Sequence, residues 1–359
     1  MTDHPYKHLP DKAFWRRSVA APKPDTVDPT GLFTLRLEPH TRVATAGSCF
    51  AQHIARHLSQ SGYNYYIAET GHPILSAALK KKHNYGTFSA RYGNIYTARQ
   101  LLQLFQRAFG SFTPVEEFWT SPSGAIVDPF RPTVQPGGFI SREEMEADRA
   151  QHLRAVRNLF ETLDVFVFTL GLTECWRSKT DGAVFPLCPG VEGGAFDDDS
   201  YEFYNQSVTD VIADMTSFLG NLRAVNPACQ IILTVSPVPL AATADPGAHV
   251  LSASTYSKSV LRVAAEELRR AHDFVHYFPS YEIITGAYAR GRYYADDLRN
   301  VTETGVEHVM GLFLRHAGTS GAHAAAPPVS NDTHDGFLER GEAFVKVECD
   351  EIALDRPGS

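Results

Sequence analysis

Apolar positions along this chain follow two periods, and together they predict its secondary structure. Short apolar runs typical of buried strands occupy 42–45, 63–68, 164–170, 230–235 and 274–278. Apolar residues spaced three and four apart predict helices near 54–58, 101–105, 153–160, 208–218, 260–268 and 306–313. Because strands and helices alternate, we expect an α/β fold with a three-layer parallel sheet of about five strands.

Two stretches interrupt this alternation. Residues 70–145 and 177–204 are rich in turn formers and aromatic residues, and we interpret them as large loop insertions, the first of which shapes a substrate pocket. Both belong to one α/β domain over 41–316, which follows an extended N-terminal arm over 1–40. Residues 317–359 begin with an aperiodic run of Ala, Gly, Pro and Ser and are predicted to be a flexible linker and tail.

Composition and charge argue against several classes of partner. The chain has 359 residues, 43% of them hydrophobic, which is enough for a large core. With a net charge of −8 and no Lys/Arg-rich block, it is not expected to bind nucleic acid. No window approaches the ~20 apolar residues of a membrane span, and residues 1–20 lack a signal-peptide core, so we expect no transmembrane segment and a cytoplasmic location. The five cysteines are scattered, odd in number and never arranged as CxxC, so we expect neither a disulfide framework nor a zinc site, and no cofactor.

Ser48 falls where the first predicted strand meets the first predicted helix. In an α/β sheet, ligands bind beyond the carboxyl ends of the strands, and a helix start offers unpaired N–H groups and a positive dipole end. A serine at this turn can attack a carbonyl carbon while its own N–H stabilises the oxyanion. Two alternatives stay open: Ser48 caps the helix, or Cys49 is the nucleophile.

Other polar residues follow the later strands. The loops at 171–173, at 236–237 and around Asp297 should meet at the same sheet edge as Ser48. Glu174 is either a buried carboxylate near the pocket or a favourable charge at a helix start. Trp176 is either a substrate platform or a core residue, and Lys258 is expected to lie in solvent.

Six short motifs carry a resemblance to a known family. They are Gly47-Ser48-Cys49-Phe50-Ala51, Tyr92-Gly93-Asn94-Ile95-Tyr96, Phe168-Thr169-Leu170-Gly171-Leu172-Thr173-Glu174, Thr234-Val235-Ser236-Pro237-Val238, Tyr256-Ser257-Lys258-Ser259 and Tyr277-Phe278-Pro279-Ser280-Tyr281-Glu282. Through them the stretch 40–316 resembles the GSCFA family, which is similar to the SGNH/GDSL hydrolases. The resemblance implies a flavodoxin-like (SGNH hydrolase-like) fold with strand order 2-1-3-4-5.

The same resemblance implies roles for individual residues. It makes Ser48 the nucleophile and places Ser48, Gly93 and Thr173 at an oxyanion hole, although SGNH hydrolases have asparagine where Thr173 stands. A threonine hydroxyl can still donate one hydrogen bond. The residues expected to contact substrate are Asn94, Glu174, Trp176 and Asn300.

The last catalytic motif departs from the hydrolase pattern. SGNH hydrolases carry Asp-x-x-His, whereas this chain has Asp297 followed by Asn300, which cannot accept a proton at neutral pH. His249, His308 and His53 are candidate replacements. We expect His249 to be the base, oriented by Asp297, because His249 lies in a loop after strand 230–235 and the other two lie in helices. Its alternative role is a helix-entry histidine bonded to the backbone.

Two functions from different classes fit these features. The first is acyl-ester chemistry at Ser48, as an esterase or O-acyltransferase acting on an acylated glycan or lipid-linked intermediate of polysaccharide biosynthesis. The second is a non-catalytic module that binds a carbohydrate or acyl ligand in the same pocket and has lost the histidine. Ser48, Gly93 and Asp297 favour the first, and Asn300 favours the second.

Overall fold

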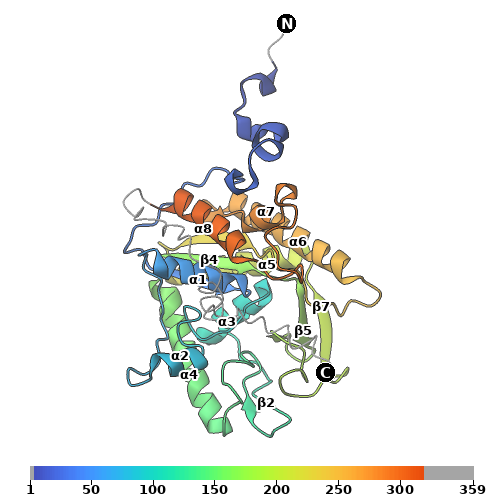
Figure 1. Ribbon diagram of the computed structural model, residues 1–359. Helices are drawn as coiled ribbons and strands as arrows, with labels where there is room; N and C mark the ends of the chain where they lie inside the picture. Colours follow the sequence, from blue (N-terminus) through green and yellow to red (C-terminus); the bar gives the residue numbers. More distant parts are fainter. Residues whose placement is uncertain (1–3, 319–359) are drawn as a thin grey trace, which may run out of the picture.

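A four-stranded parallel sheet lies at the centre of the computed structural model, which describes residues 4–318 (Figure 1). Its strands are β1 (Val43–Gly47), β4 (Val165–Leu170), β8 (Gln230–Val235) and β9 (Val275–Tyr277), in the order β1-β4-β8-β9. Every residue of β1 and β4 is buried. The near-continuous apolar runs in the sequence therefore reflect strands covered on both faces.

The fifth predicted strand, 63–68, is reduced to one bridge. Tyr65 pairs in parallel with Val43 at the free edge of β1, and the N–H of Tyr66 donates to the carbonyl of Val43. The N–H of Ala68 instead donates to the carbonyl of Ser89, because the chain has left the sheet edge by that point. The predicted order 2-1-3-4-5 is thus retained, with its second member only a bridge.

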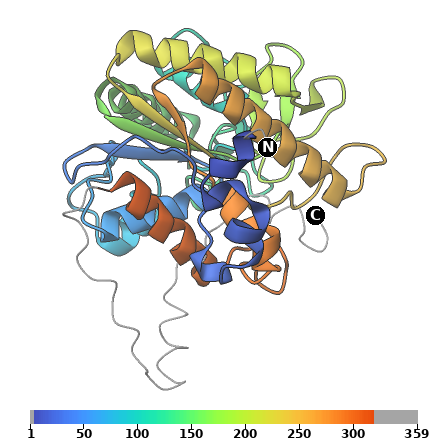
Figure 2. The same cartoon turned by 90° about the horizontal axis from the view of Figure 1, so that it is seen from above.

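Helices cover both faces of the sheet and complete three layers (Figures 1 and 2). One face packs against α3 (Ala98–Ala108), α4 (Arg142–Thr162), α5 (Val208–Val225) and α6 (Val250–Ala271). The other packs against α1 (Phe50–Gln60), α7 (Ser280–Thr285) and α8 (Glu303–Ala317). Within β4, Phe166 and Phe168 join the first core and Val165 and Val167 the second, as the alternation of side chains along a strand requires.

The two predicted insertions carry small structures of their own. Within 70–145 lie α2 (Ala77–Lys82), the hairpin of β2 (Trp119–Thr120) and β3 (Ile126–Val127), and α3, which packs on the central sheet. From Glu174 onward the chain forms an antiparallel sheet of β6 (Val184–Phe185), β5 (Glu174–Ser178) and β7 (Tyr201–Asn205). Glu174 therefore begins a strand, and its interpretation as a charge at a helix start is wrong.

Buried ion pairs fasten the first insertion to α4. Arg131 bonds to Asp128 at 2.9 Å and to Asp148 at 2.8 Å, and Arg91 bonds to Asp148 at 2.6 Å. Asp128, Arg131 and Arg91 are all at least 97% buried. Because an isolated buried charge is costly, these paired charges hold the insertion in one position.

The N-terminal arm has two parts. Residues 4–26 form short helical turns, η1 (Pro5–His8), η2 (Asp11–Ala13), η3 (Arg16–Ala20) and η4 (Pro24–Thr26), of mostly exposed residues that project from the body (Figure 1). Phe33 and Leu37 instead join the core beside α8.

A last turn, η5 (Ala287–Ala289), follows α7. The predicted tail over 317–359 lies, beyond Gly318, outside the described residues.

The helices within residues 4–318 include none that is long and apolar enough to cross a membrane.

Candidate functional site

Ser48 lies in the short connection between β1 and α1, at the carboxyl edge of the sheet. Gly47 makes the turn possible: its φ is +137°, and a Cβ there would lie 2.3 Å from the carbonyl oxygen of Thr169. The hydroxyl of Ser48 is buried and has no hydrogen-bond partner within residues 4–318. Ser48 therefore does not cap α1, whose N-cap is Cys49 with no side-chain cap bond.

Three segments distant in sequence meet around this serine. The N–H of Ile95 donates to the carbonyl of Gly47 at 2.8 Å. The N–H groups of Gly171 and Leu172 donate to the carbonyl of Tyr96 at 3.1 and 2.9 Å. A Cβ added at Gly171 would lie 3.0 Å from the Cβ of Ser48. The absence of a side chain at Gly171 thus leaves room for the serine.

Gly93 and Asn94 belong to the same meeting point. Gly93 has a φ of +71°, which turns the chain into the segment that bonds to Gly47. Asn94 is buried; its side-chain oxygen accepts from Gln52 at 3.4 Å, and its carbonyl accepts from Gln100 at 2.9 Å. Asn94 is therefore held by hydrogen bonds from both α1 and α3.

Thr173 lies at the carboxyl end of β4, with both of its donors engaged. Its N–H donates to the hydroxyl of Ser257 at 3.0 Å, and its own hydroxyl donates to the side-chain oxygen of Asn205 at 2.7 Å. Thr173 is fully buried. Its hydroxyl could reach an oxyanion only by giving up Asn205, so its predicted role remains a prediction.

Lys258 is a residue that the sequence interpretation misplaced. It is 3% exposed, and its Nζ donates to the carbonyl of Gly171 at 2.6 Å. With Ser257, it fixes the 171–173 loop from α6. A lone lysine on an amphipathic helix is usually solvated; the signal that could have found it is its place in the Tyr256-Ser257-Lys258-Ser259 motif.

Asp297 and Asn300 bond to each other in an exposed turn. One carboxylate oxygen of Asp297 accepts from the N–H groups of Arg299 and Asn300 at 3.0 and 2.9 Å, and the other accepts from the side-chain amide of Asn300. Burial raises the pKa of Asp297, but these hydrogen bonds outweigh it and lower the pKa. Val301 packs against Cys49 and Val238, which places this turn near Ser48.

None of the three candidate histidines bonds to Ser48. His249 is exposed and caps α6, where its Nδ1 accepts from the N–H of Leu251 at 3.1 Å. This is the alternative role considered for His249, a histidine that bonds to the backbone where a helix begins. His308 bonds through Nδ1 to the hydroxyl of Tyr293 at 2.7 Å. Burial lowers the pKa of His53 to about 3. The role of His249 as the base therefore remains a prediction.

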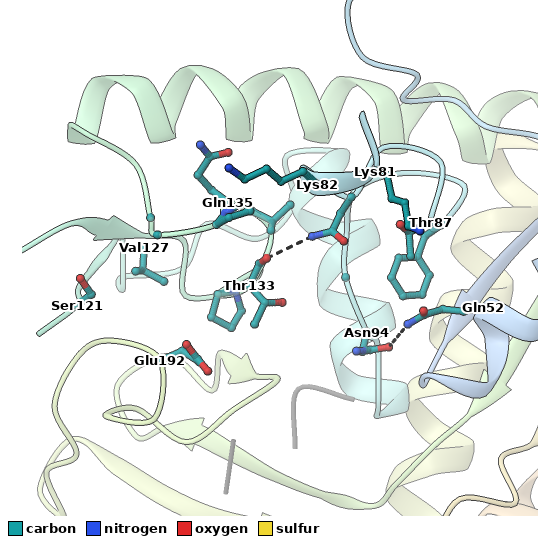
Figure 3. Close-up of a pocket in the computed structure, with 18 of the residues that line it drawn as sticks. Gln52, Lys81, Lys82, Thr87, Asn94, Ser121, Val127, Thr133, Gln135 and Glu192 are labelled. Carbon is teal, nitrogen blue, oxygen red and sulfur yellow. Dashed lines mark hydrogen bonds between the residues drawn. The ribbon is translucent and has the colours of Figure 1, made fainter. Parts of the chain in front are cut away.

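Two cavities are lined by residues of the Gly93–Tyr96 segment, and Ser48 is among the described lining residues of neither. The larger has a volume of about 720 Å³ and is lined by Gly93 and Asn94 and by polar side chains that include Gln52, Lys81, Lys82, Gln135 and Glu192 (Figure 3). Figure 3 shows the Gln52–Asn94 bond at one end of this cavity and Ser121 at the other. The smaller cavity, of about 360 Å³, is lined by Tyr96 and by the predicted Glu174 and Trp176.

Glu174 and Trp176 sit on β5, in the wall of the smaller cavity. The carboxylate of Glu174 accepts from the hydroxyl of Thr243 at 2.8 Å. Burial raises the pKa of Glu174 above its ordinary value. Trp176 packs edge-on against Phe196 and Phe203, so it serves local packing while facing the cavity.

Comparison with known proteins identifies a family for this chain. The sequence model of the GSCFA family matches residues 42–313, which extend from the start of the first sheet strand into the last helix. No curated protein matches the chain.

Proposed function

The chain belongs to the GSCFA family, and from the geometry around Ser48 we propose that it carries out serine-dependent acyl-ester chemistry, as an esterase or an O-acyltransferase. The observation behind this proposal is the buried hydroxyl of Ser48, which has no hydrogen-bond partner within residues 4–318. A buried hydroxyl without a partner costs about 1–3 kcal/mol. Such a group can find its partner in a substrate, an ion or a water molecule. The hydroxyls of Thr169 and Thr234 also lack a partner within residues 4–318, but they lie within strands, whereas Ser48 lies in the turn beyond the end of one.

The reaction would proceed through an acyl-serine. The Oγ of Ser48 attacks the ester carbonyl carbon, the alcohol leaves with the serine's proton, and water or an acceptor hydroxyl then takes the acyl group. The N–H of Ser48 makes only a long bond, 3.4 Å, to the carbonyl of Thr169, and an oxyanion could replace it. Gly93 and Thr173 are the further proposed contributors to the oxyanion hole.

The larger cavity supports an acylated glycan or lipid-linked intermediate as substrate. Its amide, hydroxyl and lysine side chains match the many hydrogen-bonding groups of a sugar, and Lys81 and Lys82 would favour an anionic one. Asn94 is a proposed substrate contact in this cavity, and Asn300 is the proposed contact from the Asp297 turn. A role in polysaccharide biosynthesis in the cytoplasm is part of this proposal.

A second candidate function is a non-catalytic carbohydrate or acyl-ligand binding module. The pairing of Asp297 with Asn300 favours it, because the acid that would orient a histidine is occupied by an amide.

Labelling with a serine-directed fluorophosphonate separates the two functions. We expect the label on Ser48, its loss in Ser48→Ala, and its retention in Ser217→Ala, which removes an exposed serine on α5. A protein that binds acylated oligosaccharides but neither takes up the label nor turns over esters would be the binding module. Labelling that survives in Ser48→Ala would contradict the assignment of the nucleophile.

A further inference from the structure

The smaller cavity differs in chemistry from the larger one. Its walls are mainly apolar, with Tyr96, Leu172, Trp176, Leu187, Phe203 and Leu240 among the residues that form them. Glu174 is the charged side chain among its described lining residues. At about 360 Å³ the cavity is at the small end of the range for ligand sites.

Its near wall is built from the groups that surround Ser48. Tyr96 and Leu172 are joined by the bond from the Leu172 N–H to the Tyr96 carbonyl, and both belong to one apolar cluster with Leu240. Gly171 precedes Leu172 and lies against the Cβ of Ser48. Ser48 itself lines neither cavity. The segment that bonds to Gly47 through the N–H of Ile95 borders the polar cavity at Asn94 and the apolar one at Tyr96, so a carbonyl carbon bound at Ser48 would have one cavity next to each end of this segment.

We propose that the smaller cavity binds the acyl chain of the ester, and that this chain is uncharged and of short to medium length. The inference rests on the proposed function, because it places the acyl carbonyl at Ser48. Each methylene that moves from water to these apolar walls makes the binding free energy more favourable. An acyl chain that ends in a second carboxylate would be repelled by the carboxylate of Glu174 in the cavity wall. The alcohol part of the ester would then occupy the polar cavity.

The mouth of the cavity offers a site for a matched pair of variants. Ala242 is exposed, lines the cavity and follows the carboxyl end of β8, so a tryptophan there can cover the cavity without entering a packed core. Ala228 is also exposed but precedes the amino end of β8, at the opposite sheet edge. Ala242→Trp and Ala228→Trp therefore add the same exposed side chain beyond opposite ends of β8.

The first measurement is kcat/KM for acetyl and hexanoyl p-nitrophenyl esters. We expect the hexanoyl ester to be preferred, and the hexanoyl-to-acetyl ratio to fall about tenfold or more in Ala242→Trp, because up to four methylenes lose their apolar contacts. The ratio should be unchanged in Ala228→Trp. Equal ratios in all three proteins would overturn the proposal while leaving the proposed function intact.

The second measurement does not depend on turnover. In Ser48→Ala, titration calorimetry should show hexanamide binding about tenfold or more tighter than acetamide. Ala242→Trp in the same background should remove this difference. If hexanamide binds in this way but no ester is turned over, the proposed catalysis fails and the acyl site stands. If neither amide is preferred, the acyl site is wrong.

Discussion

The turn at Gly47 and Ser48 depends on one backbone position that has no room for a side chain. Gly47→Ala would place a methyl group 2.3 Å from the carbonyl oxygen of Thr169 at a φ of +137°. We expect a loss of about 3 kcal/mol or more in the free energy of unfolding, measured by urea denaturation. Gly220→Ala is the control, since Gly220 is exposed in α5 with nothing within 4 Å of its added Cβ. That variant should gain about 0.5–1 kcal/mol. Equal effects at both sites would contradict the role assigned to Gly47.

Position 300 tests whether a missing histidine limits catalysis. Asn300→His would restore an Asp-x-x-His pair, and Asp297, which already accepts from residue 300, could orient the imidazole. We expect kcat for short acyl esters to rise about tenfold or more, because general-base catalysis typically contributes 10²–10⁴. The gain should disappear when Asp297→Asn is added. No change in kcat would mean that Ser48 uses another proton acceptor or that the fold serves binding alone.

At the scale of elements, the buried pair of His152 on α4 and Glu69 predicts a pH dependence. Burial lowers the pKa of His152 from 6.5 to about 4, with the charge of Arg131 acting in the same direction and the hydrogen bond to Glu69 opposing it. The unfolded chain binds the proton more readily than the folded one. His152 should therefore contribute stability above about pH 6.5 that is lost as the pH falls toward 4.

The check is the free energy of unfolding at pH 7.5, 6 and 5, measured for the wild type and His152→Asn. The variant should lack the part of the pH dependence that His152 contributes. His249→Asn should retain it, because His249 is exposed. If the free energy of unfolding of His152→Asn falls with pH as steeply as that of the wild type, other groups cause the pH dependence.

Elements were predictable from sequence where burial was uniform. The runs 164–170 and 230–235 became β4 and β8 almost residue for residue, since both faces of these strands are covered by helices. The segment 63–68 is rich in aromatic residues but lies at the sheet edge, where it forms only the bridge to Val43 before the N–H of Ala68 bonds to Ser89 instead. β5 was missed because its half-buried side chains give no apolar run.

The candidate site was only partly predictable for a related reason. Ser48, Gly93 and the 171–173 loop could be found because each follows a strand or carries a family motif, and the structure brings them together. The burial of Lys258 depends on a long-range bond to Gly171, which has no local periodic signal. The bond from Thr173 to Asn205 is also long-range, and it reaches β7 of the small antiparallel sheet, which the sequence pattern did not reveal.

At the scale of the whole molecule, the N-terminal arm should divide into a dispensable part and a structural part. Asp28 bonds to His316 at 2.7 Å, and the N–H of Leu37 donates to the carbonyl of Ala317 at 2.7 Å, so the second half of the arm ties the chain's start to the end of α8. Leu37 is fully buried and Phe33 is 6% exposed. Before Val27 the arm is mostly exposed.

Two truncations test this division. Removing residues 1–21 should leave Tm unchanged to within about 2 °C and preserve fluorophosphonate labelling of Ser48, because few buried contacts are lost. Removing residues 1–38 should lower Tm by about 5 °C or more, since the cavities left by Phe33 and Leu37 open the core that also contacts α1, the helix that follows Ser48. Labelling should then weaken along with stability. If the longer truncation left both quantities unchanged, the packing of the arm against α8 would contribute nothing to the serine site.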